Sequence, residues 1–560
     1  MKKFWILAVF LVACGDAGSS DVSDTQDPDT SGKGDIYGTD DRSELFDRDV
    51  LAAHKRVAAA TAIAVSPAGI RDINSSQVTL NNISFATRQR ATLGGPLCSS
   101  ERFLSQPAPG FCSAFLIAPD LVATAGHCVN RDVPVHEANY VFGFGYETIG
   151  STVTTLPRNN VYQGKTVVGH IFDQGELNLQ DTLNGEMWED WAVVQLDRPV
   201  TGRTPVSLRE AAVVSGELAT AIGHPSGLPT KVTPGTVVDA SKSKFYNTDL
   251  DIYQGNSGSL VADQNGEAIG IVIRGSGGDS FTQTADGCYA SKRCESVGST
   301  AACIGNHVMR AYPLHTFADP TIRRVISQGA LSPTVAIPDG TSTGMVASRT
   351  VTDSGAIEYV TLNVNLFHAA PQELEFYLEH NGKTVAVSKR PRVWKGGNIR
   401  FSRTTYDFAG LDAQGEWRLR VVDPTAGATT SQYVEWWQLV LGVGNGRVQP
   451  VQPVEPEPTP AFVGTPCASN ADCGFSVGGV TGVCYNQTFC TLPCQGYCPD
   501  SAGFAPTFCV ASDAGAGICA SRMTADNNYC AAIPNTRGKD AARYIGSSSA
   551  PAVTKSVCLP

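Results

Sequence analysis

The sequence has no excess of basic residues. Among 560 residues, 42 Lys and Arg stand against 53 Asp and Glu, a formal net charge of −11. A nucleic-acid-binding protein needs a basic face, so this balance argues against nucleic-acid partners. Beyond the N-terminus the chain also lacks an apolar run as long as a membrane span. The chain is longer than a single domain with one hydrophobic core, so about three folded units are expected.

The C-terminal region is rich in cysteine but lacks the paired CxxC spacing of a zinc ribbon. Disulfide bonds are therefore predicted there, and these form in an oxidising compartment. The cysteines of this region are Cys467, Cys473, Cys484, Cys490, Cys494, Cys498, Cys509, Cys519, Cys530 and Cys558.

The N-terminal stretch MKKFWILAVFLVAC has two lysines, a short apolar run and a cysteine, the order of an export signal. LVAC resembles the lipobox of bacterial lipoproteins, which implies that Cys14 is lipidated after cleavage; the alternative is a plain signal peptide. The other cysteines are then even in number, as pairing requires. We expect an exported protein, at the bacterial cell surface or outside the cell, that meets a membrane only through the lipid.

Composition divides the chain into six segments. They are the lipoprotein-type signal (1–14), an acidic flexible tether (15–35), a first β-rich domain (36–330), a second (331–445), a proline-rich linker (446–464) and a small disulfide-rich domain (465–560). The β-rich domains contain apolar runs of strand length, such as WAVVQL and AIGIVI, and alternating runs such as ELEFYLEH. The fold class is therefore mainly β. One exception is PTIRRVISQG, which predicts a helix ending at Gly329.

The string DIYQGNSGSLV, residues 251–261, makes Ser257 a candidate nucleophile. Acyl transfer by serine needs a base, an acid that orients the base, and donors for the oxyanion. His127 is the candidate base, because it ends the stretch FCSAFLIAPDLVATAGHCV directly before Cys128. Cys112 is spaced to form a disulfide with Cys128 that pins the histidine loop. The alternative is a buried histidine beside a structural disulfide.

Three aspartates compete for the role of the orienting acid, namely Asp181, Asp190 and Asp197. Asp190 opens the strand-like run DWAVVQL, so its carboxylate lies at the mouth of a buried strand. An orienting acid should be shielded in such a place. Asp190 is therefore the preferred candidate, with Asp181 as the main alternative.

TAGHC, GNSGSL and the chain order His, Asp, Ser resemble the chymotrypsin-fold (trypsin-like) serine peptidases. The resemblance implies a double β-barrel over 36–330, a triad of His127, Asp190 and Ser257, and an oxyanion hole made by the backbone amides of Gly255 and Ser257. It also implies that Cys112 and Cys128 form the family's histidine-loop disulfide.

IYGTDDRSELFD and GNHVMRAYPL resemble the bacterial glutamyl-endopeptidase branch of this family. Asn256 stands where animal relatives have an aspartate that pairs with a freed N-terminal ammonium. An amide has no charge for that pair, so activation is not expected to run through this salt bridge.

The residues of the specificity pocket are Asp251, Arg274 and Gly275 by resemblance. A buried carboxylate at Asp251 would favour Arg or Lys before the scissile bond. Bacterial relatives, however, carry an aspartate at this offset without basic specificity. Arg274 would bind an acidic side chain or else face solvent, and the preference stays open.

Residues 331–445 resemble the P domain of proprotein convertases, from IPDGTSTGMV through GEWRLRVVD to EWWQLVL. The resemblance implies a jelly-roll β-sandwich that stabilises or positions the catalytic domain, with calcium at carboxylates such as Asp339 or Asp423. The alternative is an ordinary sandwich without metal. The cysteine-rich domain is too small for a large core and is expected to bind a surface polymer or another protein.

Together these features predict an exported serine endopeptidase that acts on proteins or peptides. No cofactor and no catalytic metal are required. The second hypothesis is a surface adhesin built on a peptidase scaffold.

Overall fold

The computed structural model describes residues 34–129, 138–172, 189–275, 280–300, 303–389, 397–427, 432–444, 461–477, 479–501, 504–523, 530, 533–545 and 553–560. The chain divides into two compact units, Met1–Gln452 and Pro453–Pro560, each described here by itself. The predicted signal, Cys14, and most of the tether and linker lie outside the described residues. No helix in the described part of the chain is long and apolar enough to cross a membrane.

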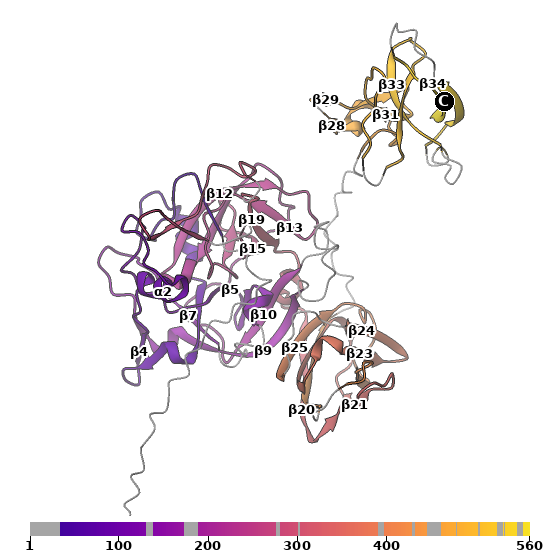
Figure 1. Cartoon of the computed structure of the whole chain (residues 1–560). Helices are drawn as coiled ribbons and strands as arrows, with labels where there is room; N and C mark the ends of the chain where they lie inside the picture. The colour runs from indigo at the N-terminus through magenta and orange to yellow at the C-terminus, as the bar shows by residue number, and fades with distance from the viewer. Residues whose placement is uncertain are drawn as a thin grey trace, which may run out of the picture. The chain divides into compact units, whose positions relative to one another are not determined.

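Two closed six-stranded antiparallel barrels form the first part of the larger unit (Figure 1). The first barrel closes in the order β10-β6-β5-β2-β7-β9. Its strands are β2 Thr61–Val65, β5 Cys112–Ala118, β6 Leu121–Thr124, β7 Asn139–Phe142, β9 Val161–Phe172 and β10 Asp190–Leu196. The second barrel closes in the order β11-β12-β13-β19-β15-β14. Its strands are β11 Leu218–Gly223, β12 Lys231–Asp239, β13 Phe245–Thr248, β14 Leu260–Ala262, β15 Ala268–Arg274 and β19 Asn306–Arg310.

The apolar runs of the sequence become the buried barrel strands. WAVVQL lies in β10 and AIGIVI in β15, and both strands are buried along nearly their whole length. Short elements flank the barrels. They are α1 Ala52–Ala58, α2 Phe85–Leu93, α4 Leu314–Ala318, β1 Ile36–Tyr37, β3 Ile70–Asp72, β4 Gln77–Leu80, β8 Thr155–Pro157, β16 Phe281–Gln283, β17 Tyr289–Ser291 and β18 Arg293–Cys294.

The second part of the larger unit is a sandwich of two four-stranded antiparallel sheets, ordered β20-β27-β22-β25 and β21-β26-β23-β24. Its core contains Phe376, Phe401, Trp417 and Trp437, contributed by both sheets. The strands are β20 Arg323–Ala336, β21 Met345–Val351, β22 Ala356–His368, β23 Glu375–His380, β24 Lys383–Lys389, β25 Gly397–Thr405, β26 Gly415–Val422 and β27 Tyr433–Gly444.

The helix predicted at PTIRRVISQG is wrong. From Arg323 onward this stretch is strand β20, which pairs with β27 from the partners Arg323 and Val443 onward. Val325 packs into the sandwich core. A long cross-strand pairing outweighs a weak local helical pattern, because tertiary contacts override propensity.

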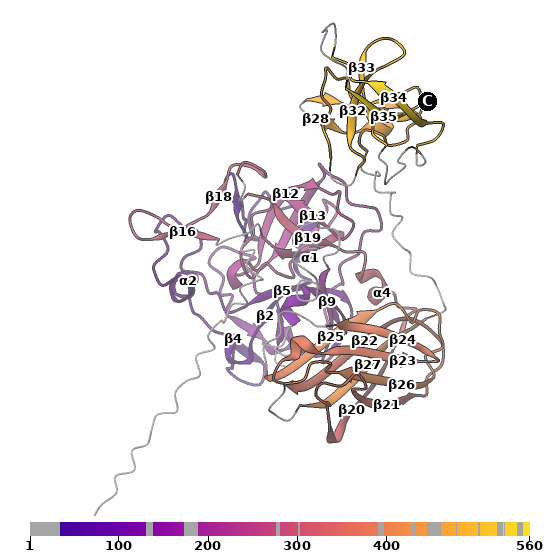
Figure 2. The same cartoon turned by 45° about the vertical axis from the view of Figure 1, so that its right-hand side comes forward.

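The sandwich lies against the first barrel. Strands β22 and β25 contact β9, and β25 lies beside β9 in both Figure 1 and Figure 2. Tyr359 and Val440 of the sandwich belong to the same buried cluster as the apolar residues of that barrel. The rings of Trp191, Phe317 and Tyr359 follow one another at centroid distances of 5.5 and 4.5 Å.

The smaller unit consists of short hairpins joined by disulfides. Its strands are β28 Ser476–Val477, β29 Val480–Thr481, β30 Val483–Tyr485, β31 Phe489–Thr491, β32 Thr507–Ala511, β33 Gly517–Ser521, β34 Arg537–Ala542 and β35 Thr554–Leu559. Its disulfides are Cys467–Cys484, Cys473–Cys490, Cys494–Cys509, Cys498–Cys519 and Cys530–Cys558. The predicted disulfide-rich region is confirmed, and these pairs, with those of the larger unit, indicate a location outside the cytoplasm.

Candidate active site

The turn that carries Ser257 lies between β13 and β14 and is closed by its own hydrogen bonds. The N–H of Asn256 donates to the carbonyl of Tyr253 (2.9 Å), and the N–H of Ser259 donates to the carbonyl of Asn256 (2.8 Å). Gly258 has a φ of +85°, and a Cβ there would lie 2.0 Å from the carbonyl oxygen of Ser113. Only glycine fits this turn, because a side chain would be strained and would clash.

Asn256 stabilises this turn through its side chain. Its Oδ1 accepts a hydrogen bond from the Ser259 hydroxyl (3.1 Å), and the residue is buried. Asn256 and Ser259, which flank Ser257 and Gly258 in the GNSGSL motif, therefore bond to each other within the turn.

Ser113 on β5 holds the turn in place through two hydrogen bonds. Its N–H donates to the carbonyl of Ser257 (2.8 Å), and its hydroxyl donates to the carbonyl of Gly255 (2.9 Å). The N–H of His224 in turn donates to the Ser113 hydroxyl (3.0 Å). Ser113 was not among the residues predicted from the sequence, although a polar residue in the buried apolar run CSAFLIA is itself a signal.

The peptide group before Gly255 has a defined direction. The N–H of Ser226 donates to the carbonyl of Gln254 at 2.6 Å. A peptide group is planar and trans, so its N–H points away from its carbonyl. The N–H of Gly255 is therefore directed away from Ser226.

His127 lies on a short 3-10 turn, Gly126–Val129, and contacts Asp190 at the start of β10. Its Nδ1 is 2.7 Å from Asp190 Oδ2, and its backbone N–H donates to Asp190 Oδ1 at 2.9 Å. Burial acts to lower the pKa of His127, but the charge and hydrogen bond of Asp190 outweigh it, so the pKa lies above 6.5. The carboxylate thus orients the ring and stabilises its charged form.

The histidine turn and the nucleophile turn are adjacent. Cys128 forms the disulfide with Cys112, and its Sγ lies 3.7 Å from the carbonyl oxygen of Ser257. His127 and Ser257 are both partly exposed, whereas Asp190 is buried. His127 and its partner Asp190 therefore lie next to the turn that carries Ser257.

The competing aspartates are not found at this place. Asp197 is exposed, and its carboxylate pairs with Arg198 at 2.8 Å. Asp181 lies outside the described residues.

Asp251 is buried against the N-terminal segment. Its Oδ1 accepts from the N–H of Tyr37 (2.7 Å) and its Oδ2 from the N–H of Asp41 (3.2 Å). Burial, above all, raises the pKa of Asp251 to about 7. The guanidinium of Arg42 lies 4.3 Å from the ring centre of Tyr253, so the same segment also packs on the nucleophile turn.

Arg274 lies at the end of β15, followed by buried Gly275. Its Nε donates to Nδ1 of His307 on β19 at 2.8 Å. Burial lowers the pKa of Arg274 to about 10, an effect opposed by the charge of Asp190. His307, which the sequence analysis missed, is buried beside Phe245 at a centroid distance of 4.9 Å.

The segment after β15 is held by two disulfides. Cys294–Cys303 closes a loop within it, and Cys98–Cys288 ties it to the segment after α2.

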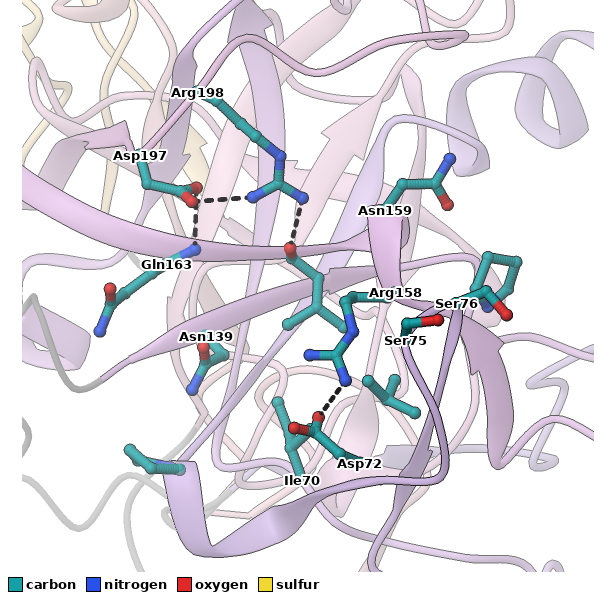
Figure 3. Close-up of a pocket in the computed structure, with 14 residues that line it drawn as sticks. Ile70, Asp72, Ser75, Ser76, Asn139, Arg158, Asn159, Gln163, Asp197 and Arg198 are labelled. Atoms are coloured by element: carbon teal, nitrogen blue, oxygen red, sulfur yellow. Dashed lines mark hydrogen bonds and ion pairs between the residues drawn. The ribbon is translucent and has the colours of Figure 1, made fainter.

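A large open groove, of about 940 Å³, lies elsewhere on the first barrel, beside β3 and β8 (Figure 3). Its cations are compensated within it, since Arg158 pairs with Asp72 at 2.7 Å and Arg198 with Asp197 at 2.8 Å. No member of the triad lines it.

The first of the two closed barrels carries the His127–Asp190 pair, which lies next to the turn of Ser257. Residues 112–271 match the family model of the trypsin-like peptidase domain. Over 125 residues the chain is 34% identical to the periplasmic serine endoprotease DegP of Salmonella typhimurium, covering 21% of this chain and 26% of that protein. Over 138 residues it is 29% identical to a probable periplasmic serine protease do/HhoA-like of Haemophilus influenzae, covering 22% and 29%. The chain thus spans less than a third of the length of these relatives.

Among solved structures, the chain is similar to a Glu endopeptidase in complex with MPD, with a TM-score of 0.27 and 15% identity over 49% of this chain and 93% of that one. It is also similar to the HtrA-type protease AlgW with decapeptide, with a TM-score of 0.27 and 17% identity over 50% of this chain and 72% of that one.

Proposed function

We propose that the protein is a secreted or surface-anchored serine endopeptidase that hydrolyses protein or peptide substrates. The Ser257 hydroxyl attacks the scissile carbonyl while His127 takes its proton, and Asp190 holds the imidazole in the required orientation. The amides of Gly255 and Ser257 stabilise the oxyanion. His127 then protonates the leaving amine, and water hydrolyses the acyl-enzyme.

The observation that carries this proposal is the His127–Asp190 pair at 2.7 Å next to a nucleophile turn fixed by Ser113. A scaffold retained only for binding needs neither. The bond between Asn256 and Ser259 supports a turn that is stable without an N-terminal ammonium, so we propose activity independent of that salt bridge.

The test is casein hydrolysis by the exported full chain and by Ser257→Ala. We expect the substitution to remove nearly all activity, with a loss on the order of 10⁶-fold if the triad acts as a unit. Ser348→Ala is the control, because it alters an exposed serine on the sandwich. Equal hydrolysis by the wild type and Ser257→Ala would refute the proposal.

The alternative is a surface adhesin on a peptidase scaffold. A serine-directed phosphonate probe separates the two, because it labels only an activated serine. Labelling of the wild type but not of Ser257→Ala supports the peptidase, and an unlabelled, correctly folded wild type supports the adhesin.

For the accessory parts we propose a P domain in the sandwich, a lipid on Cys14, and binding of a surface polymer or protein by the disulfide-rich unit. Catalysis needs no cofactor, because the triad supplies both nucleophile and base. Structural calcium at carboxylates such as Asp339 or Asp423 stays part of this proposal, with an ordinary sandwich without metal as the alternative. Asp423 Oδ2 lies 3.1 Å from His368 Nε2, and its Oδ1 accepts from the N–H of Thr425.

A further inference from the structure

His170 of β9 lies between the catalytic histidine turn and the sandwich. Its ring is buried, with Nε2 3.0 Å from the carbonyl oxygen of Gly126 and Nδ1 2.7 Å from the carbonyl oxygen of Ser402. Gly126 directly precedes His127, and Ser402 belongs to β25 of the sandwich. Whichever nitrogen carries the proton, the imidazole spans the two backbones and donates to at least one of them.

Position 126 has no room for a side chain. A Cβ at this position would lie 2.4 Å from the carbonyl oxygen of Ile171 and 3.0 Å from Asp190 Oδ1. His170 therefore contacts the turn at a packed peptide group. The turn is held on one side by Asp190, through the His127 N–H, and on the other by His170.

The sandwich holds β9 at His170 and at the preceding residues Val168 and Val167. The N–H of His170 donates to the Thr404 hydroxyl (2.8 Å), which is also 2.8 Å from the hydroxyl of Thr361. Thr361 donates to the carbonyl of Val168 (2.7 Å), at the bulge where the pairing of β9 with β10 shifts register. Asn363 donates to the carbonyl of Val167 (3.0 Å).

These bonds are made by buried side chains of the sandwich to a strand of the peptidase barrel. Such groups are costly to leave unpaired, so the contact is a fixed one. A domain that only tethered the peptidase would need no polar contact with the residue that bonds the turn of the general base.

We propose that the sandwich is part of the catalytic apparatus, and that His170 is the positioning residue through which β25 holds the turn of the general base. The inference rests on the proposed peptidase function and deepens it. His170 touches neither substrate nor nucleophile. It acts by keeping the His127 ring aligned with Ser257.

The test compares His170→Phe, which keeps a ring but removes both nitrogens, with His170→Gln, which restores one amide donor. Steady-state kinetics on a peptide ester are measured for the exported full chain, with thermal unfolding alongside. We expect His170→Phe to lower kcat by about 10- to 100-fold with KM within about twofold, because small displacements of a catalytic group cost this much. His170→Gln should recover most of kcat.

His380→Phe is the matched control. This buried histidine of the sandwich also contacts two carbonyl oxygens, those of Glu416 (2.9 Å) and Asp412 (2.7 Å), but these belong to the sandwich itself. It should lower the unfolding temperature and leave kcat unchanged. A wild-type kcat in folded His170→Phe, or an equal loss of kcat in His380→Phe, would overturn the inference.

Thr404→Val keeps His127 and His170 and removes only a hydroxyl, so it provides a second test if His170→Phe does not fold. We expect a smaller fall of kcat in the same direction, and an unchanged kcat would again overturn the inference. Inactive wild-type protein would instead refute the proposed function, so the two failures are distinguishable.

Discussion

At the scale of single residues, His127 is placed under two opposing influences. Burial favours its neutral form, and the carboxylate of Asp190 at 2.7 Å favours its charged form. The carboxylate prevails, so the pKa lies above 6.5. A general base must be neutral to accept a proton, and the enzyme therefore loses activity as the pH falls through this pKa.

We therefore expect kcat/KM of the wild type to rise with pH along a limb whose midpoint lies above 6.5. In Asp190→Asn only burial remains, so the midpoint should move to lower pH while kcat falls on the order of 10⁴-fold. The measurement is a pH profile of peptide-ester hydrolysis for both proteins. A limb that stays in place in Asp190→Asn would show that Asp190 does not act on His127.

The position of Asp251 in the sequence suggests that it binds a basic substrate side chain, but its contacts in the structure do not support this role. Both carboxylate oxygens face backbone N–H groups, of Tyr37 and Asp41, and the side chain is buried. A carboxylate occupied in this way fixes the N-terminal segment and is not offered to a substrate cation.

We expect Asp251→Asn to change the ratio of kcat/KM for Arg- and Leu-containing substrates by less than about threefold. A carboxylate that bound the substrate cation would be worth on the order of 100-fold, about 3 kcal/mol for a charged hydrogen bond. Matched peptide amides differing only before the scissile bond give the ratio. A large fall in the preference for Arg would place Asp251 in the pocket.

At the scale of elements, the strands with continuous apolar runs were predictable. β10 and β15 are buried on both faces, so nearly every residue is apolar and the run itself marks the strand. β20 was not predictable in the same way. Its pairing partner, β27, lies about a hundred residues further along the chain, and local sequence does not record that contact.

Within the site, too, residues in local sequence motifs were predictable, and residues that contact distant segments were not. His127, Asp190 and Ser257 occur in short motifs whose spacing reflects local turns, so the sequence alone suggested them. Ser113 and His170 act through backbone groups of distant segments, at Gly255 and Gly126. A hydrogen bond to a carbonyl leaves no trace in the partner's side chain, so only the folded chain reveals such contacts.

At the scale of the whole molecule, the sandwich and the disulfide-rich unit differ in the interactions that stabilise them. The sandwich shares buried clusters and hydrogen bonds with the first barrel. The disulfide-rich unit has its own core around Phe508 and Val510. Each of the eight disulfides among the described residues closes within one unit, and none of them joins the two units.

We therefore expect a chain ending at Gln452 to keep the casein-hydrolysing activity of the full protein within about twofold, and to unfold at the same temperature in calorimetry. The physical reason is that the unit removed contributes no disulfide to the peptidase, so its loss leaves the barrels and sandwich closed. A chain ending at residue 322 is the contrasting control. It exposes the apolar rings of Phe317 and Trp191 and removes the partners of His170, so it should be unstable and inactive. If the chain ending at Gln452 were inactive, the disulfide-rich unit would be required for catalysis, and the prediction would be wrong.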